Sequence, residues 1–169
     1  IGDGKHGFCA SYIHTGGKVG VILAVEAGSP AAAEHAATRT FAEETAMQIA
    51  AMSPVALRRD QIDEASVAKQ REIFEALMRE DPQFTGARAK PEAMWAKIVD
   101  GKIAKWFQEV VLLDQESAQH KKAIKELMAE TGKAAGADIA ITEFVRFERG
   151  EGLEKKTEDL RQGVAELLQ

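Results

Sequence analysis

The sequence contains few cysteine, proline and aromatic residues, and it has no long run of apolar residues. Its single cysteine, Cys9, excludes an internal disulfide and favours a reducing compartment, although one thiol could still bridge two chains. No stretch approaches 18 continuous apolar residues, so we expect no membrane span, and no segment has the pattern of a signal peptide. These absences favour a globular protein that works without a membrane partner.

The sequence also lacks an excess of positive charge. Its formal net charge is -5 and its pI is about 5.5. Binding to duplex nucleic acid needs clustered Lys and Arg, so we expect no nucleic-acid partner, although a local basic patch is not excluded. The 169 residues suffice for one domain or two small ones with a buried core. Because the sequence begins at Ile1 and opens on loop-like residues, we expect it to be part of a longer protein.

The stretch SYIHTGGKVGVILAV, residues 11–25, has the pattern of a β-hairpin. We predict strands over 8–14 and 19–26, joined by a turn in which glycine can adopt positive φ at little steric cost. The turn is Thr15-Gly16-Gly17-Lys18. In the second strand the alternating apolar residues predict one buried face, made by Val19, Val21, Leu23 and Val25.

Helical periodicity follows this hairpin. Ser29 and Pro30 predict a helix start, and small residues beside the apolar face of that helix would let it lie close to a sheet. Gly132 is placed to end a later helix. We expect helices over 30–52, 60–81, 91–113, 118–131 and 154–168, and a third strand within 138–151. The fold class is therefore α+β: a small antiparallel sheet with helices packed on one face and a protruding antiparallel helical hairpin.

Three kinds of chemical site were considered. Gly17-Lys18 is followed by a strand and by no helix N-terminus, which argues against a phosphate-binding loop. Cys9 and His14 are an odd number of residues apart, so they face opposite sides of the sheet and cannot pair, and we expect Cys9 to be buried. The histidines lack metal-ligand spacing, so we expect no metal and no cofactor; they are His6, His14, His35 and His120.

Two features are consistent with protein recognition, and each has a structural alternative. His14 lies at the predicted hairpin tip, either as a solvated turn residue or as a contact residue on a protein-binding edge. Trp95 and Trp106 are eleven residues apart, which places them on one helix face. They either pack within the helical hairpin or form a stripe for a partner, since aromatic residues are favoured interface anchors.

Four segments, taken together and in order, resemble the translation elongation factor Ts family. The first is the hairpin stretch, and the others are AMQIAAMSP (46–54), KIVDGKIAKWFQEVVLLDQES (97–117) and FVRFERGEGLEKK (144–156). They are similar to a strand-turn-strand, an alanine-rich helix, the returning arm of a helical hairpin, and the last core strand. The family's N-terminal helical domain has no counterpart in this sequence. The first half of the core, with its Thr-Asp-Phe-Val segment, has none either, and the alanine-rich stretch near residue 30 is longer than in the family.

The resemblance implies a guanine-nucleotide exchange factor for elongation factor Tu, with no covalent chemistry of its own. By the family pattern, His14, Thr15, Gly16 and Gly17 face the partner GTPase, and the C-terminal helix contacts its nucleotide-binding domain. The arm that carries Trp95 and Trp106 would serve dimerisation or further partner contact. The resemblance leaves open whether the chain forms a homodimer.

The expected organisation has four parts. Residues 1–59 form the first part of a core subdomain, 60–113 the helical arm, 114–152 the second part of the core, and 153–169 a C-terminal helical module. We expect a cytoplasmic protein, or one of an organellar matrix if the source is a eukaryote. The alternatives are a free-standing dimerisation or scaffold module without exchange activity, and a small hydrolase, for which we find no clustered base and nucleophile.

Overall fold

The computed structural model describes residues 6–84, 91 and 94–151, and its fold is α+β as predicted. The predicted helix over 154–168 and the module over 153–169 lie outside these residues. None of the described helices is long and apolar enough to cross a membrane. The strands are β1 (His6–Ile13), β2 (Val19–Ala27) and β3 (Ile139–Glu148); the helices are α1 (Pro30–Glu34), α2 (Ala36–Met52), α3 (Glu64–Glu80), α4 (Trp95–Val110) and α5 (Ile124–Ala135). Short 3-10 turns lie at Arg59–Gln61 and Leu112–Asp114.

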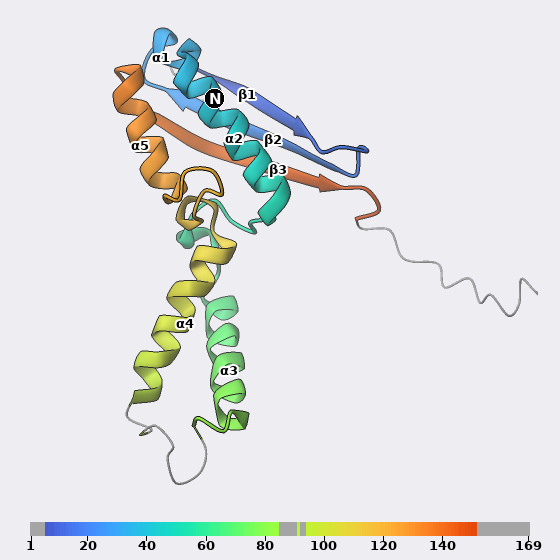
Figure 1. Ribbon diagram of the computed structural model, residues 1–169, viewed down its shortest axis with the longest axis vertical. Helices are drawn as coiled ribbons and strands as arrows, with labels where there is room; N and C mark the ends of the chain where they lie inside the picture. The colour runs from blue at the N-terminus through green and yellow to red at the C-terminus, as the bar shows by residue number, and fades with distance from the viewer. Residues whose placement is uncertain (1–5, 85–90, 92–93, 152–169) are drawn as a thin grey trace, which may run out of the picture.

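The sheet is antiparallel throughout, in the order β1-β2-β3. The alternation predicted for β2 is confirmed, because Val21, Leu23 and Val25 are fully buried. Their side chains meet α1, α2 and α5 in one hydrophobic core. Figure 1 shows these helices on one side of the sheet. The other face of the sheet carries exposed apolar side chains, which are Ile13, Ile22, Val145 and Phe147.

The alanine-rich segment forms two helices where we predicted one. The Ser29 side chain accepts a hydrogen bond from the Ala32 amide at 3.2 Å, which confirms the predicted cap of α1. His35 then leaves helical geometry, and its Nδ1 accepts from the Ala37 amide at 3.2 Å to begin α2. In α2, Ala42 and Ala46 are fully buried, so small side chains do bring this helix close to the sheet.

The position of α5 differs from the prediction at both ends. It begins at Ile124, because residues 117–122 form a compact turn closed by a 2.8 Å bond from the Ser117 amide to the Lys122 carbonyl. It ends at Gly136, whose φ of 75° is the left-handed conformation of a helix cap. Gly132 is therefore not the cap. It lies inside the helix, where a Cβ would come within 3.1 Å of the Ala137 carbonyl oxygen, so the glycine lets the chain at residue 137 approach closely.

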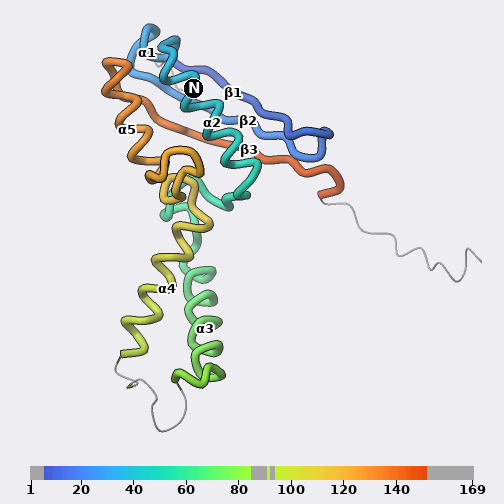
Figure 2. Tube along the Cα trace, viewed as in Figure 1, coloured from blue at the N-terminus to red at the C-terminus, as the bar shows by residue number. Residues whose placement is uncertain are grey.

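The helices α3 and α4 lie side by side and extend away from the sheet layer (Figures 1 and 2). We call α3, α4 and their connection the arm. Asp63 caps α3 by accepting from the Ser66 amide at 2.7 Å, and the hydrogen bonds from Ser66 lower the pKa of Asp63. The arm has its own hydrophobic cluster, whose buried members are Met78, Phe84, Val99 and Ile103. Leu77 next to this cluster is 55% exposed, although the apolar spacing of α3 predicts that it packs beside Met78.

The expectation that Cys9 is buried is wrong. Cys9 is exposed, because the side chains of β1 that pack against the core are Phe8, Ala10 and Tyr12. Side chains alternate along a strand, so the residue between Phe8 and Ala10 must face the other side. That side is the sheet face opposite the helices. Cys9 is thus an accessible thiol on the open sheet face.

Candidate partner-binding site

The tip between β1 and β2 is a tight turn of exposed residues. The His14 amide donates to the Val19 carbonyl and the Gly17 amide donates to the His14 carbonyl, both at 2.9 Å. Gly16 and Gly17 have φ of 86° and 64°, as a turn with positive φ requires. All five residues from His14 to Lys18 are exposed. The predicted turn is confirmed, and we call residues 14–18 the tip.

The imidazole of His14 is held from the core side of β1. The Tyr12 hydroxyl and His14 Nδ1 share a hydrogen bond of 3.1 Å, and the two rings lie 6.2 Å apart in a tilted arrangement. Tyr12 itself packs partly against the hydrophobic core, so its ring is a fixed support. This contact leaves the rest of the His14 ring facing solvent. The tip therefore presents an oriented imidazole to any molecule that approaches it.

The end of β3 supports the tip from the side. The Arg149 amide donates to the Lys18 carbonyl at 2.8 Å, which ties the tip to the chain just after β3. Ile13 and Phe147 both pair with Gly20 in the sheet register, and they are 73% and 57% exposed. Exposed apolar side chains beside a polar tip are typical of a protein interface.

Trp95 and Trp106 belong to α4, which is part of the arm and lies away from the hairpin end of β1 and β2 (Figure 1). Both are half-buried and pack against the hydrophobic cluster of the arm. Trp95 meets Phe84 edge to face at 6.0 Å, and Trp106 lies 5.2 Å from Phe107. Their position fits packing within the hairpin. Both residues stay partly accessible, which keeps a partner contact open as a proposal.

The described residues offer little for covalent chemistry. Among them, no group of three His, Cys, Asp or Glu side chains is placed to hold a metal ion. His35 caps α2, and His120 pairs with Glu44 through a 2.8 Å contact between Nε2 and Oε2. Cys9 and His14 project from opposite faces of the sheet, as predicted. The arrangement can recognise a surface, but it does not present a nucleophile beside a base.

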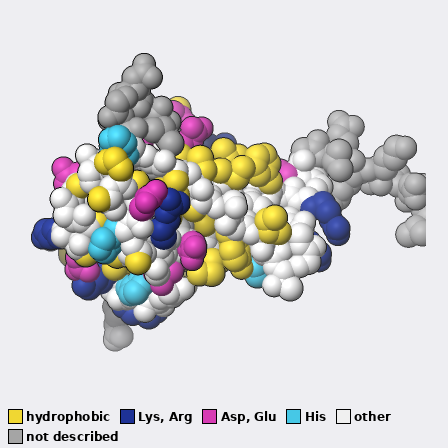
Figure 3. Space-filling model, turned by 90° about the horizontal axis from the view of Figure 1, so that it is seen from above, with side chains coloured by type: hydrophobic (Ala, Val, Ile, Leu, Met, Phe, Trp, Pro, Cys, Tyr) yellow, Lys and Arg dark blue, Asp and Glu magenta, His cyan; other side chains and the backbone are white. Residues whose placement is uncertain are grey.

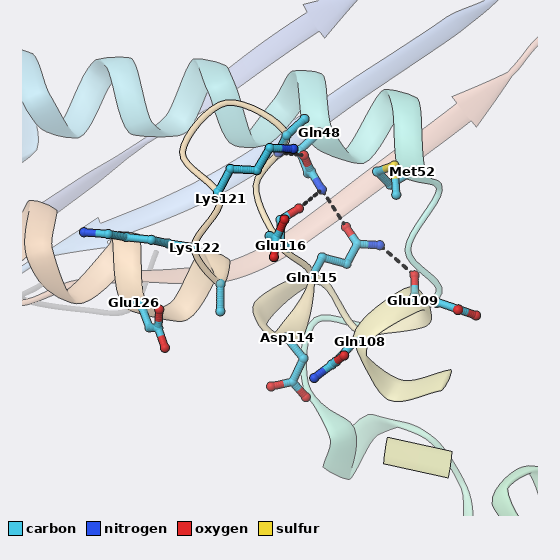
Figure 4. Close-up of a pocket in the computed structure, with 12 residues that line it drawn as sticks. Gln48, Met52, Gln108, Glu109, Asp114, Gln115, Glu116, Lys121, Lys122 and Glu126 are labelled. Carbon is cyan, nitrogen blue, oxygen red and sulfur yellow. Dashed lines mark hydrogen bonds between the residues drawn. The ribbon is translucent and has the colours of Figure 1, made fainter. Parts of the chain in front are cut away.

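The surface charge is also uneven. In Figure 3, which looks down on the sheet and its helices, charged side chains and histidines crowd one end, and hydrophobic side chains gather along the middle. A pocket of 560 Å³ lies where α2, α4 and α5 meet, and its lining includes three glutamines, Gln48, Gln108 and Gln115 (Figure 4).

Sequence reasoning missed several residues of these sites. Tyr12 was not linked to His14, although residues two apart on a strand share a face and the pattern could have shown it. Ile13 and Phe147 become neighbours only through the sheet register, which no local pattern reveals. The Gln48–Gln115 contact joins residues 67 positions apart, so only the fold brings it about.

Comparison with known proteins matches this chain to one family. The family model described as Elongation factor TS matches residues 2–151. Elongation factor Ts of Clostridium perfringens (strain SM101 / Type A) is 42% identical over 166 residues, which cover 96% of this chain and 50% of that protein. Elongation factor Ts of Bdellovibrio bacteriovorus is 41% identical over 92% of this chain and 48% of its own length.

A third relative is shorter. Elongation factor Ts of Anaeromyxobacter sp. (strain Fw109-5) is 39% identical over 160 residues, which cover 94% of this chain and 70% of that protein. The chain thus spans about half the length of the Clostridium and Bdellovibrio relatives.

Proposed function

The chain belongs to the elongation factor Ts family, and from this premise we propose that it binds elongation factor Tu and takes part in guanine-nucleotide exchange during translation elongation. The proposal includes no covalent step and no cofactor. It places the protein with the translation machinery, in the cytoplasm or in an organellar matrix.

Exchange needs only differential binding. A factor that binds the nucleotide-free form of a GTPase more tightly than the GDP form lowers the affinity for GDP by the same ratio. The protein must therefore offer a preformed surface that one conformation of the partner fits better. It needs no reactive group for this purpose.

The observation that carries the proposal is the tip. His14 is exposed, its ring is oriented by Tyr12, and the backbone beneath it is fixed by three hydrogen bonds. A preorganised contact of this kind loses little conformational freedom when it binds. We propose that His14 makes the main side-chain contact with elongation factor Tu, and that Thr15, Gly16 and Gly17 contribute through their backbone.

The test is release of a fluorescent GDP analogue from elongation factor Tu, followed after addition of an excess of unlabelled GDP. We expect this chain to bind the GTPase and to accelerate release of the analogue. No binding and an unchanged rate of release would contradict the proposal.

Self-association is a second candidate, and the open sheet face favours it. Ile22 and Val145 are neighbours in the register on that face, and both are exposed. The accessible parts of Trp95 and Trp106 provide a second surface on the arm. Sedimentation velocity over a hundredfold range of concentration tests the homodimer, which a concentration-independent monomer would exclude.

A further inference from the structure

The arm joins the body through two chain segments that run side by side. The Val55 amide donates to the Val110 carbonyl at 2.9 Å, and the Leu112 amide donates to the Ala56 carbonyl at 2.9 Å. Four apolar residues of this junction are buried, which are Ala56, Leu57, Val111 and Leu112, whereas Val55 at its edge is exposed. We call this crossing of residues 55–57 and 110–113 the joint.

Two buried amide side chains lie at the joint, and Gln115 is the central one. It is 1% exposed. Its Nε2 donates to the Glu109 carbonyl at the end of α4 at 2.8 Å, and its Oε1 accepts from Gln48 Nε2 on α2 at 3.4 Å. Its own backbone carbonyl accepts from the Ile124 amide, the first residue of α5, at 2.9 Å. One residue is thus bonded to the arm and to two helices of the body (Figure 4).

Gln48 completes the arrangement from α2. Its Nε2 also donates to the Glu116 carbonyl at 3.2 Å, and its Oε1 accepts from the Ala118 amide at 3.3 Å. The oxygen and nitrogen of both side-chain amides therefore have protein partners. Neither glutamine therefore presents an unpaired amide atom to the adjacent 560 Å³ pocket. Fully paired amides are expected of a structural contact, whereas a ligand site would present free donors or acceptors.

A buried amide pair is more directional than an apolar contact. Apolar side chains can slide past each other at small cost, whereas a buried amide that loses its partners pays the desolvation of each polar atom. Asp114 adds an ionic brace beside it, since it accepts from Arg59 and, at 2.9 Å, from Lys125. That brace is partly exposed and is weakened by salt, but the amide pair is not.

We propose that Gln115 and Gln48 are positioning residues that fix the direction of the arm relative to the sheet. The pair would keep the tip and the arm at one spacing, so that a partner able to touch both meets a rigid frame. The geometric part of this inference is independent of the proposed function. Only its consequence for elongation factor Tu rests on that function.

The distance between arm and sheet can be measured directly in the full chain. Cys9, the only cysteine, is exposed on β1 and takes one spin label; Ala76→Cys, at an exposed position of α3, takes the other. Pulsed electron paramagnetic resonance then gives the distribution of distances between the two labels. We expect one narrow peak, unchanged in high salt.

Gln115→Leu and the double variant Gln48→Leu/Gln115→Leu are compared in this labelled background. The double variant removes both buried amides at once. The backbone groups that it leaves behind belong to Glu109, Glu116 and Ala118, which are exposed residues whose bonds to the glutamines are only partly buried, so the variant should fold. Gln108→Leu is the matched control, since Gln108 lines the same pocket from α4 but is exposed.

We expect the peak to broaden or shift in the double variant and to stay unchanged in the control. Hydrogen exchange at residues 110–115 should rise by at least about thirtyfold, which corresponds to two hydrogen bonds of ordinary net strength out of the four that the double variant loses, while exchange in β2 and β3 stays the same. An unchanged peak in a folded double variant would overturn the inference. Failure of the parent chain to bind elongation factor Tu would instead count against the proposed function and leave this result standing.

Discussion

Replacement of His14 by alanine separates a recognition role from a structural one. The side chain is exposed, and its side-chain hydrogen bond is the 3.1 Å contact with the Tyr12 hydroxyl. An exposed contact of this kind contributes little, so His14→Ala should change the free energy of unfolding by no more than about 0.5 kcal/mol. Truncation of a contact residue in an interface costs about 1 kcal/mol or more, which is about a fivefold loss of affinity.

Two further variants serve as controls. Tyr12→Phe keeps the ring in the core and removes only the hydroxyl that orients His14, so it should lower affinity by less than His14→Ala and leave folding intact. Gly16→Val forces a β-branched side chain to a φ of 86°, so it should lower stability by about 1 to 2 kcal/mol and weaken binding together with it.

The assay is a binding titration with elongation factor Tu, paired with urea unfolding of the same samples. A His14→Ala protein that unfolds as easily as Gly16→Val would show that His14 is structural. A variant with parental affinity and parental stability would make His14 a bystander, and the carry-over from the family would fail at this residue.

Three other perturbations test the fold. Gly132→Val puts a branched side chain where a Cβ alone would lie 3.1 Å from the Ala137 carbonyl oxygen, and it should cost about 1 to 3 kcal/mol in chemical unfolding, whereas Gly136→Asn, at the left-handed cap, should cost clearly less. Burial by itself would raise the pKa of Asp114, but hydrogen bonds from Lys125 and Arg59 outweigh it and hold the pKa below the usual value. The stabilisation by Asp114 is thus complete above its unfolded-state pKa of about 4 and is lost as pH falls through its folded-state pKa. The urea midpoint of Asp114→Asn should therefore depend less on pH below about pH 5 than the urea midpoint of the parent. Deletion of residues 62–110 with a short glycine linker should leave a folded body, because the arm has a separate hydrophobic cluster, and loss of a cooperative thermal transition would refute this.

The parts of the fold that follow from local periodicity could be predicted from the sequence. The alternation in β2 identified its buried face, and the glycines of the tip identified the turn, because each depends on neighbours along the chain. The same rule should have placed Cys9 outside. Phe8 and Tyr12 hold β1 against the core, and Cys9 is an odd number of residues from each of them, so its side chain faces the other side.

Other features depend on contacts that the sequence does not display. Gly132 and Gly136 are four residues apart, and either could end a helix. Only the structure shows that Gly136 is the cap and that Gly132 lies close to Ala137. Gln115 has no local signature as a buried residue, since its partner on α2 comes 67 positions earlier. Polar residues that become buried through long-range contacts are therefore the part of the site that had to be seen in the structure.

The central claim is that the chain takes part in exchange by binding one state of elongation factor Tu better than another. The most direct measurement is its affinity for nucleotide-free elongation factor Tu and for the complex with GDP and Mg²⁺, determined by calorimetric titration under one set of conditions. The account predicts tighter binding to the nucleotide-free form, and a ratio of the two affinities that equals the loss of GDP affinity caused by the chain. Equal affinity for the two forms, or no binding to either, would contradict it.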